Sequence, residues 1–522
     1  MHDLLEDHLI DIRTSAGERQ VCLPQLLALL SAGEVDGYAA LRAHQADPWH
    51  VFLVQIAASV LSRRPTSSLP VDPAYWREGL LELADGKSSA WHLVVDDVAK
   101  PAFLQHPLSG QDDFARLAPK AMAPDELDVL VTAKDHDVKM ARAEGQSVQA
   151  WLYALLTCQT TSGFLGVGNF GALRMNGGLG SRLVVTLTSD PHPSRRFAEE
   201  VLRLAEMRSE VAAKYGYRSR GIVLTWLAPW NLDGHQLDVS ELEPWFIEAV
   251  RRVRLVRSGE GIAAYGAASN ARQIGPKNLD SGDVGDPWIP IDVENEKKGR
   301  AALTVVAGGW TPKLITKLLF QQGFELTALQ VPRPGEGTLW FMGSVFVRGK
   351  GKTEGFHRFA VPVPSKVRRR LLHRESAIGI GEFAQKLLGD AATAERAVGS
   401  ALMVLAEGGP EHIDFEDRRV NERINEWTRK VHGEFSRRWE TSYFPTLWRA
   451  AEVEDTAPMR VEWQEYLVAQ ARETLRQAER SLPLSTARRY RALVRAETML
   501  QASLRSAGLA KLRPRQPEES VA

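Results

Sequence analysis

The sequence predicts an α+β protein, in which a large mixed N-terminal α/β domain is followed by a C-terminal helical bundle of the four-helix type. Up to Val363, stretches typical of strands and of helices are mixed without a regular βαβ repeat, which argues against a doubly wound sheet. Beyond Pro362-Val363-Pro364 the pattern is helical only. With 522 residues the chain is long enough for two cores. We expect residues 1–363 to form the mixed domain, 364–513 the bundle, and 514–522 a disordered tail.

The N-terminal region contains several readable elements. Leu9 to Arg13 alternates apolar and polar residues, and after a turn at Ser15 to Glu18 the chain returns, which predicts a hairpin. The apolar run Trp49 to Leu61 predicts a buried helix. We also expect a helix at Leu242 to Arg254, followed by mostly irregular structure from Ser258 to Pro290.

The C-terminal region predicts helices at about 366–388, 391–407, 415–440, 458–481 and 485–507, with breaks at Gly408-Gly409-Pro410 and Leu482-Pro483. In the last helix, apolar residues recur at helical spacing and predict its inner face: Tyr490, Leu493, Val494, Leu500 and Leu504.

Composition limits the class of protein. Lys plus Arg and Asp plus Glu are both 65, so any contact with nucleic acid must be local or shared with partners. The two cysteines form no C-x-x-C pair, which excludes a zinc ribbon and favours a reducing compartment. The N-terminus is acidic, and no uninterrupted apolar run approaches ~20 residues. We therefore expect a cytoplasmic protein without a membrane segment.

The most informative local feature is a glycine-rich segment, with seven glycines between Thr160 and Gly180. Gly166 to Gly171 matches G-x-G-x-x-G, but a dinucleotide site needs a strand before it and a helix after it, and here the predicted order is reversed. A turn-rich connector is the plainest alternative. The third interpretation is close approach of the main chain to a ligand, because glycine lacks a Cβ. A DNA minor groove, only ~6 Å wide, is such a ligand.

Three further features carry weaker signals. Asp135-His136-Asp137 has metal-binding residue types but no supporting His or Cys cluster, so a solvated loop is favoured. The hairpin tip Arg348 to Gly355 holds three cations and one acid, which suits either solvent or phosphates. Cations also cluster at Lys366 to Arg374, and from Arg488 to Arg515 eight of them face one acid, which indicates an anionic partner.

No hydrolytic or nucleotide-hydrolysing motif is present. The sequence lacks a G-x-S-x-G elbow, a Walker A loop and H-E-x-x-H. We therefore expect no enzymatic activity, no cofactor and no metal.

The opening Leu4 to Arg13, and then Gln20 to Leu27, resemble the start of the large subunit of the type I-E CRISPR Cascade surveillance complex, the CasA family. Where that family has Trp-Ile-Pro-Val or a variant, this chain has His8-Leu9-Ile10-Asp11-Ile12. The order of parts is also similar: a polar loop, a helix, a glycine-rich segment entering a strand, and a C-terminal bundle.

The resemblance implies a non-catalytic subunit of an RNA-guided antiviral complex. Such a subunit recognises the protospacer-adjacent motif in duplex DNA from the minor groove, helps to open the duplex into an R-loop, and recruits a helicase–nuclease. Its implied partners are double-stranded target DNA, guide RNA, the helicase–nuclease, and the backbone, small and guide-end-capping subunits.

The resemblance also implies site residues. The DNA-binding set comprises a glycine loop, a basic finger and a wedge at the hairpin tip: Gly163, Phe164, Gly166, Gly168 and Asn169; Arg272 or Lys277; and Lys350, Gly351, Lys352 and Thr353. The loop that meets guide RNA and helps to dock the helicase–nuclease would use Asp137, Lys139, Arg142 and Gln146. Some relatives carry a cysteine cluster near the finger; this chain has none, so no zinc is expected.

Two rival functions come from other classes of protein. One is a nucleotide- or NAD-binding enzyme built on Gly166 to Gly171, and the other is a helical scaffold without a nucleic-acid role. Binding of nucleotides would favour the first, and salt-dependent binding of duplex DNA would argue against the second.

Overall fold

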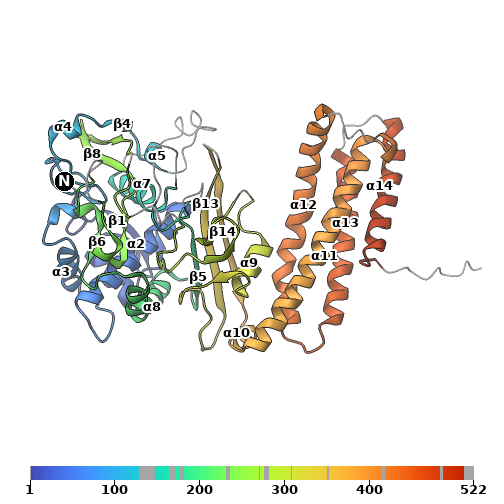
Figure 1. Ribbon diagram of the computed structural model, residues 1–522, viewed down its shortest axis with the longest axis horizontal. Helices are drawn as coiled ribbons and strands as arrows, with labels where there is room; N and C mark the ends of the chain where they lie inside the picture. Colours follow the sequence, from blue (N-terminus) through green and yellow to red (C-terminus); the bar gives the residue numbers. More distant parts are fainter. Residues whose placement is uncertain are drawn as a thin grey trace, which may run out of the picture. The chain divides into compact units, whose positions relative to one another are not determined.

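The computed structural model describes residues 2–128, 147–163, 172–176, 181–230, 236–269, 271–275, 281–306, 308–349, 352–412, 418–481 and 486–510. The chain divides into two compact units: Met1–Thr311 with Lys317–Pro362, and Pro312–Thr316 with Val363–Ala522. The first unit mixes helices and strands, and the second is helical where it is described (Figure 1). The predicted α+β class, with a C-terminal helical bundle, is therefore confirmed.

The first unit begins with the predicted hairpin. Strands β1 (Ile10–Thr14) and β2 (Gly17–Val21) pair antiparallel, with Ile10 opposite Val21 and Thr14 opposite Gly17. The short strand β3 (Gly37–Tyr38) pairs with the other edge of β1. Alternation places Ile10 and Ile12 in the core at 0% exposure, which is why this strand was readable from its pattern.

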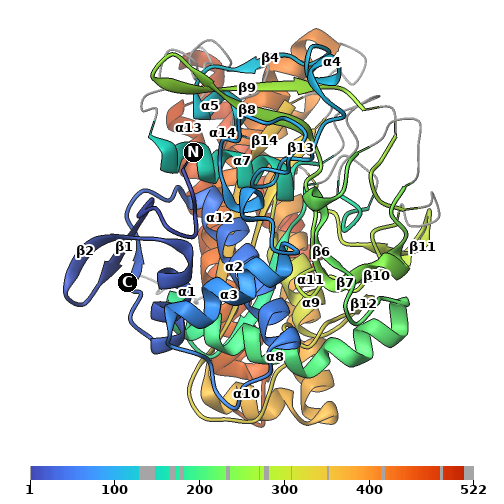
Figure 2. The same ribbon diagram turned by 90° about the vertical axis from the view of Figure 1, so that its left-hand side faces the viewer.

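The core of the first unit is built around one apolar helix, α2 (Ala43–Arg63). It contacts α3 (Pro73–Leu83), α7 (Val148–Thr161) and α8 (Pro193–Tyr215), while α1 (Leu23–Ala32) contacts α3 and α8 (Figure 2). Every residue from Val51 to Val60 is buried, so this part of α2 is enclosed on all sides.

Several small sheets complete this unit. One has the order β14-β13-β5, from β5 (Val184–Thr188), β13 (Leu339–Gly349) and β14 (Lys352–Val363). A second has the order β4-β9-β8, and a third β11-β10-β12. Their strands are β4 (Ala118–Ala121), β8 (Arg252–Ser258), β9 (Gly261–Ala267), β10 (Ile291–Asn295), β11 (Gly299–Ala302) and β12 (Phe324–Glu325). Strand β6 (Ile222–Leu224) pairs parallel with β7 (Leu242–Ile247). The short helices of this unit are α4 (Gln111–Phe114) and α5 (Pro124–Leu127). Helix α9 (Pro312–Leu319) is divided between the two units, with Pro312–Thr316 in the second.

The predicted helix at Leu242 to Arg254 is wrong. The chain instead forms β7, a connection at residues 248–251, and β8. All six residues of β7 are buried, and all except Glu243 are apolar; a short apolar stretch of this kind does not distinguish a buried strand from a buried helix. The prediction of irregular structure after Ser258 is also wrong for residues 261–267, which form β9.

The second unit contains α10 (Ser365–Leu371), α11 (Arg374–Glu407), α12 (Arg418–Ala450), α13 (Ala457–Ser481) and α14 (Thr486–Ser506). The long helices α11 to α14 run side by side (Figure 1), and α11 contacts each of the other three. The predicted inner face of α14 is only partly right. Tyr490 and Val494 are 77% and 44% exposed, whereas the buried residues are Ala492, Ala496, Leu500 and Leu504. Small alanine side chains let α14 approach its neighbours closely.

A buried carboxylate, Glu200 on α8, ties four parts of the first unit together. It accepts hydrogen bonds from Arg196 Nε at 2.9 Å, His50 Nε2 at 2.9 Å, Thr186 Oγ1 at 2.8 Å and Trp288 Nε1 at 2.9 Å. Burial by itself would raise the pKa of Glu200, but the charge of Arg196 and the contact with His50 hold that pKa below its usual range.

Acidification is expected to destabilise the first unit through this cluster. Because the folded pKa of Glu200 is depressed, its stabilising effect is complete above about 4.5, the ordinary value, and is lost as the pH falls below it. Burial also lowers the pKa of His50, so protonation of this histidine in the unfolded chain adds a loss below about 6.5. We expect Glu200→Gln to lower the melting temperature at pH 7 by about 5 °C.

The measurement is a set of thermal melts followed by circular dichroism between pH 3 and 8. The gap between Glu200→Gln and wild type should narrow at the acid end. Glu210→Gln, an exposed position on the same helix, is the control and should follow wild type throughout. A constant gap at every pH would show that the charge of Glu200 contributes nothing.

None of the described helices combines the length and apolar character needed to cross a bilayer. Within the described residues, no group of three His, Cys, Asp or Glu side chains is placed to hold a metal ion. Asp135-His136-Asp137 lies outside the described residues.

Candidate nucleic-acid interface

The chain leading into the glycine-rich segment is fixed by Arg251. Its guanidinium donates to the carbonyl of Gly163, two residues beyond the end of α7, and the residue is only 3% exposed. Gln159 on the last turn of α7 accepts from the backbone N–H of Arg251 at 2.7 Å and donates to its carbonyl at 3.0 Å. The end of α7 and residue 251 are therefore held as one piece.

The chain leaving residues 164–171 is fixed by Glu248. Its carboxylate accepts from the backbone N–H of Leu173 at 2.8 Å and that of Arg174 at 3.5 Å. Ala172 packs with Met175 and Val250 in a small apolar cluster. Burial raises the pKa of Glu248, and the hydrogen bond from Leu173 with the charge of Arg174 acts in the opposite direction.

Arg174 strengthens this second attachment. Its guanidinium donates to the carbonyls of Pro244 at 3.1 Å and Phe246 at 3.0 Å, both in β7, and lies 3.9 Å from the centre of the Phe246 ring. It is also 3.4 Å from Asp286, which receives a second ion pair from Arg182 at 2.7 Å. The chain after the glycine loop is thus held at several points.

The residues on either side of the segment 164–171, Gly163 before it and Ala172 to Arg174 after it, are here called its two stems. Both stems contact the four residues 248–251, which connect β7 and β8. Gly163 is held by Arg251, Ala172 contacts Val250, and Leu173 is held by Glu248. In general, a binding loop needs both of its ends fixed on a rigid support.

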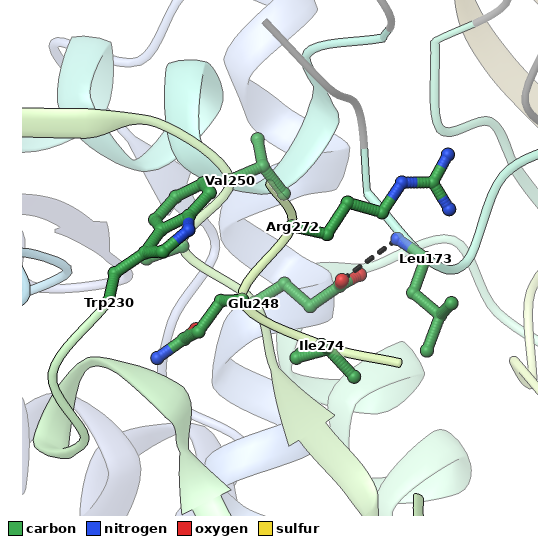
Figure 3. Close-up of a pocket in the computed structure, with 8 residues that line it drawn as sticks. Leu173, Trp230, Glu248, Val250, Arg272 and Ile274 are labelled. Carbon is green, nitrogen blue, oxygen red and sulfur yellow. Dashed lines mark hydrogen bonds between the residues drawn. The ribbon is translucent and has the colours of Figure 1, made fainter. Parts of the chain in front are cut away.

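The structure brings Arg272, one of the two finger candidates, to the same place. Arg272 and Leu173 line one small pocket together with Trp230, Glu248, Ala249, Val250, Gln273 and Ile274. In Figure 3 the Arg272 side chain extends to the same side of the pocket as Leu173. The free space of about 20 Å³ holds roughly one water molecule, so this pocket accommodates no nucleotide.

The loop carrying Arg272 is fixed to the same support. Gln273 Nε2 donates to the Thr225 carbonyl at 2.9 Å and lies 3.1 Å from His106 Nδ1, while His106 Nε2 lies 2.9 Å from the carbonyl of Ala249. With Nδ1 accepting and Nε2–H donating, a neutral imidazole satisfies the contacts with Gln273 and Ala249. The carbonyl of Ala228, 3.2 Å from Nδ1, then accepts from Gln273 Nε2 instead. Burial lowers the pKa of His106, which favours that neutral form.

Next to its tip, the hairpin β13–β14 contacts α2. The rings of Phe346 and Phe356 lie 5.3 Å and 6.4 Å from the ring of His44 on α2. His44 Nε2 is 2.8 Å from Asp128, which also accepts from Gln45 at 2.6 Å. Asp128 directly precedes residues 129–146, so His44 connects the strands next to the hairpin tip with the entry to the predicted docking loop.

Most of the predicted site residues lie outside the described residues. These are Phe164, Gly166, Gly168 and Asn169 of the glycine loop, Lys277 of the finger, Lys350 and Gly351 of the wedge, and Asp137, Lys139, Arg142 and Gln146 of the docking loop. Lys352 and Thr353 begin β14, but their side chains are not described. Gly163 and Arg272 are described: Gly163 is held by Arg251, and Arg272 lines a pocket with Glu248, Ala249 and Val250.

Sequence reasoning missed the residues that hold this site: Glu248, Arg251, His106 and His44. The sequence held one indication of these contacts, because Glu248 and Arg251 are charged residues that lie among apolar residues at 242–256. Charges in a buried run are usually paired or hydrogen-bonded. Their partners come from distant parts of the chain, so the pairing itself could not be read.

Comparison with known proteins adds an independent finding. No family model matches the sequence, and no curated protein matches it. Solved structures match over nearly the whole chain. CasA from Thermus thermophilus is 16% identical with a TM-score of 0.64, covering 97% of this chain and 99% of its own. The chain has the CasA fold.

Further CasA-like structures agree. The CRISPR-associated protein Cse1 from Acidimicrobium ferrooxidans is 14% identical with a TM-score of 0.63, covering 97% of this chain and 98% of its own. A chain of a CRISPR RNA-guided surveillance complex is 14% identical with a TM-score of 0.54, covering 96% and 99%. The resemblance to CasA read from the sequence is thereby confirmed as a likeness of fold. At this identity the roles of individual residues must be judged from their own chemistry.

Proposed function

We propose that this chain is the non-catalytic large subunit of a CRISPR RNA-guided DNA surveillance complex. In this role it recognises the protospacer-adjacent motif in duplex DNA, helps to open the duplex, and recruits a helicase–nuclease. Its partners would be guide RNA and the other subunits of the complex. The reading of the motif by protein, and of the target by base pairing, follows the general logic of RNA-guided recognition.

The observation that carries the proposal is that residues 248–251 hold both ends of the glycine segment and that Arg272 lines a pocket with Glu248, Ala249 and Val250, within a CasA fold. A main chain without side chains can enter a minor groove that bulk would block. A cation beside it is attracted by the negative potential of the groove. The two features needed for minor-groove recognition therefore share one support.

The rival enzyme function receives less support. A dinucleotide fingerprint follows a strand and opens a helix, whereas here helix α7 precedes the glycine segment and strand β5 follows it. The pocket beside its stem holds about one water molecule. A helical scaffold without a nucleic-acid role would explain neither why residues 248–251 hold both ends of the glycine segment nor why Arg272 lies beside them.

The test is a reconstituted complex assayed for two separate steps, duplex binding and strand opening. Omitting this chain should abolish the preference for DNA that carries the flanking motif. Replacing both Lys350 and Lys352 by alanine should slow opening, followed by permanganate reactivity or a fluorescent base, more than it weakens initial binding. The matched control is Lys297→Ala with Lys298→Ala, two exposed lysines beside β10.

Two results would contradict the proposal. If the complex lacking this chain still preferred the motif, recognition would reside elsewhere. If the Lys350 and Lys352 variant lost binding and opening equally, the hairpin tip would act as a phosphate contact and not as a wedge.

A further inference from the structure

A second pocket in the first unit lies apart from the residues assigned above. It has a volume of about 330 Å³ and lies between the end of α3, the turn before β6, and the chain after β6. It is lined by Arg63, Leu83, Asp85, Lys87, Arg218, Arg220, Gly221, Ile222, Leu227, Ala228 and Glu241. This is within the usual size range of small-molecule sites.

The rim of this pocket is cationic. Lys87, Arg218 and Arg220 are all exposed, and none of them forms an ion pair with a carboxylate among the residues described. Of the two acids in the lining, Glu241 already accepts the backbone N–H of Asp238 at 2.8 Å. The lining therefore holds four cations, with Arg63, and two carboxylates, Asp85 and Glu241, and this excess of positive charge favours an anionic ligand.

The turn that carries two of these cations is held rigidly. The N–H of Arg218 donates to the carbonyl of Leu242 at 2.9 Å. The carbonyls of Ser219 and Gly221 accept from Arg208 at 2.5 Å and from Arg63 at 3.0 Å. A Cβ on Gly221 would lie 2.6 Å from the carbonyl oxygen of Glu241, so only glycine allows this close packing.

Part of the lining is apolar. Leu83 is buried, and Ile222, Leu227 and Ala228 are half-buried. Arginine on a fixed backbone suits phosphate, because its planar group can donate two parallel hydrogen bonds. An apolar surface beside such a group suits the base and sugar of a nucleotide. The cationic residues of the pocket thus suit the phosphate of a nucleotide, and its apolar residues suit the base and sugar.

We propose that this pocket binds a nucleotide unit, with its phosphate at Arg218, Arg220 and Lys87 and its base and sugar against Leu83, Ile222 and Leu227. The nucleotide is either free or part of a single-stranded nucleic acid. This site is additional to the proposed reading of duplex DNA by the glycine segment, and each can fail without the other.

The experiment uses the purified full chain with two probes: AMP, and a fluorescein-labelled single strand of about ten nucleotides, for which a site of this kind is sequence-tolerant. The test variant is Arg218→Ala with Arg220→Ala. The matched control is Arg116→Ala with Arg195→Ala, two exposed arginines of the same unit outside the pocket. Melting curves check that both variants fold.

We expect the test variant to weaken binding of at least one probe about tenfold or more, while the control variant binds as wild type does. For the oligonucleotide, the slope of log K against log salt should become shallower by about 1.4, the value for two lost phosphate contacts on a single strand. AMP binding indicates a free nucleotide, and binding of the oligonucleotide without AMP indicates nucleic acid. Equal affinities for the two variants, or no binding by wild type, would overturn the proposal.

Discussion

Replacing Gly168 by aspartate is expected to weaken binding of the reconstituted complex to motif-bearing duplex DNA by about 100-fold, or ~3 kcal/mol. The proposed interface places bare main chain in a groove only ~6 Å wide, between two rows of phosphates. A carboxylate there adds both bulk and like charge, and charges of the same sign across an interface cost several kcal/mol. Gly166→Asp should act in the same way, and Gly168→Ala should cost less because it adds bulk alone.

Fluorescence anisotropy at fixed salt, with duplexes that carry or lack the motif, measures this effect. Gly379→Asp is the matched control, because an added Cβ at this exposed position on α11 meets open space. Its affinity should remain that of wild type. If Gly168→Asp also bound normally, residues 163–169 would not form the DNA-reading surface.

The elements predicted correctly from the sequence are those whose signal is local. In β1, alternation buries Ile10 and Ile12 on one face, and a glycine turn returns the chain. The helices expected at 458–481 and 485–507 match α13 and α14, and Gly408 ends α11 in the left-handed conformation that glycine favours. The division expected between 388 and 391 is wrong, because α11 continues through these residues and the break lies at 372–373, between α10 and α11. The face of α14 was misassigned because the buried positions Ala492 and Ala496 are small and give a weak apolar signal.

The support of the candidate site could not be predicted, because it depends on contacts distant in sequence. Residues 242–254 were expected to form a helix, and the apolar residues in this stretch do not distinguish a buried helix from buried strands. Glu248 is 75 positions from Leu173, and Arg251 is 88 positions from Gly163. The sequence identified the glycine segment and Arg272 as candidates, but only the fold shows that they share an attachment.

The second prediction with a large expected effect concerns Glu248, which holds the chain after the glycine segment. Glu248→Ala is expected to lower the stability of the chain by about 3 kcal/mol and to remove most of the complex's preference for motif-bearing DNA. The substitution leaves the N–H groups of Leu173 and Arg174 without their buried acceptor, so the second stem is no longer fixed. Thermal melts and the ratio of affinities for duplexes with and without the motif are the two measurements.

Two variants separate positioning of the loop from general loosening of the fold. Glu248→Gln keeps an oxygen that can accept from the N–H of Leu173. Because burial raises the pKa of Glu248, loss of the charge itself should cost little stability. This variant should therefore recover both stability and motif preference. Glu243→Ala removes another buried carboxylate of the same region, one that binds Arg208 at 2.6 Å and does not contact the stem. It should lower stability yet keep the motif preference. If Glu243→Ala lost that preference as fully as Glu248→Ala, the loss would come from a loosened fold, and residues 248–251 would have no specific part in presenting the loop.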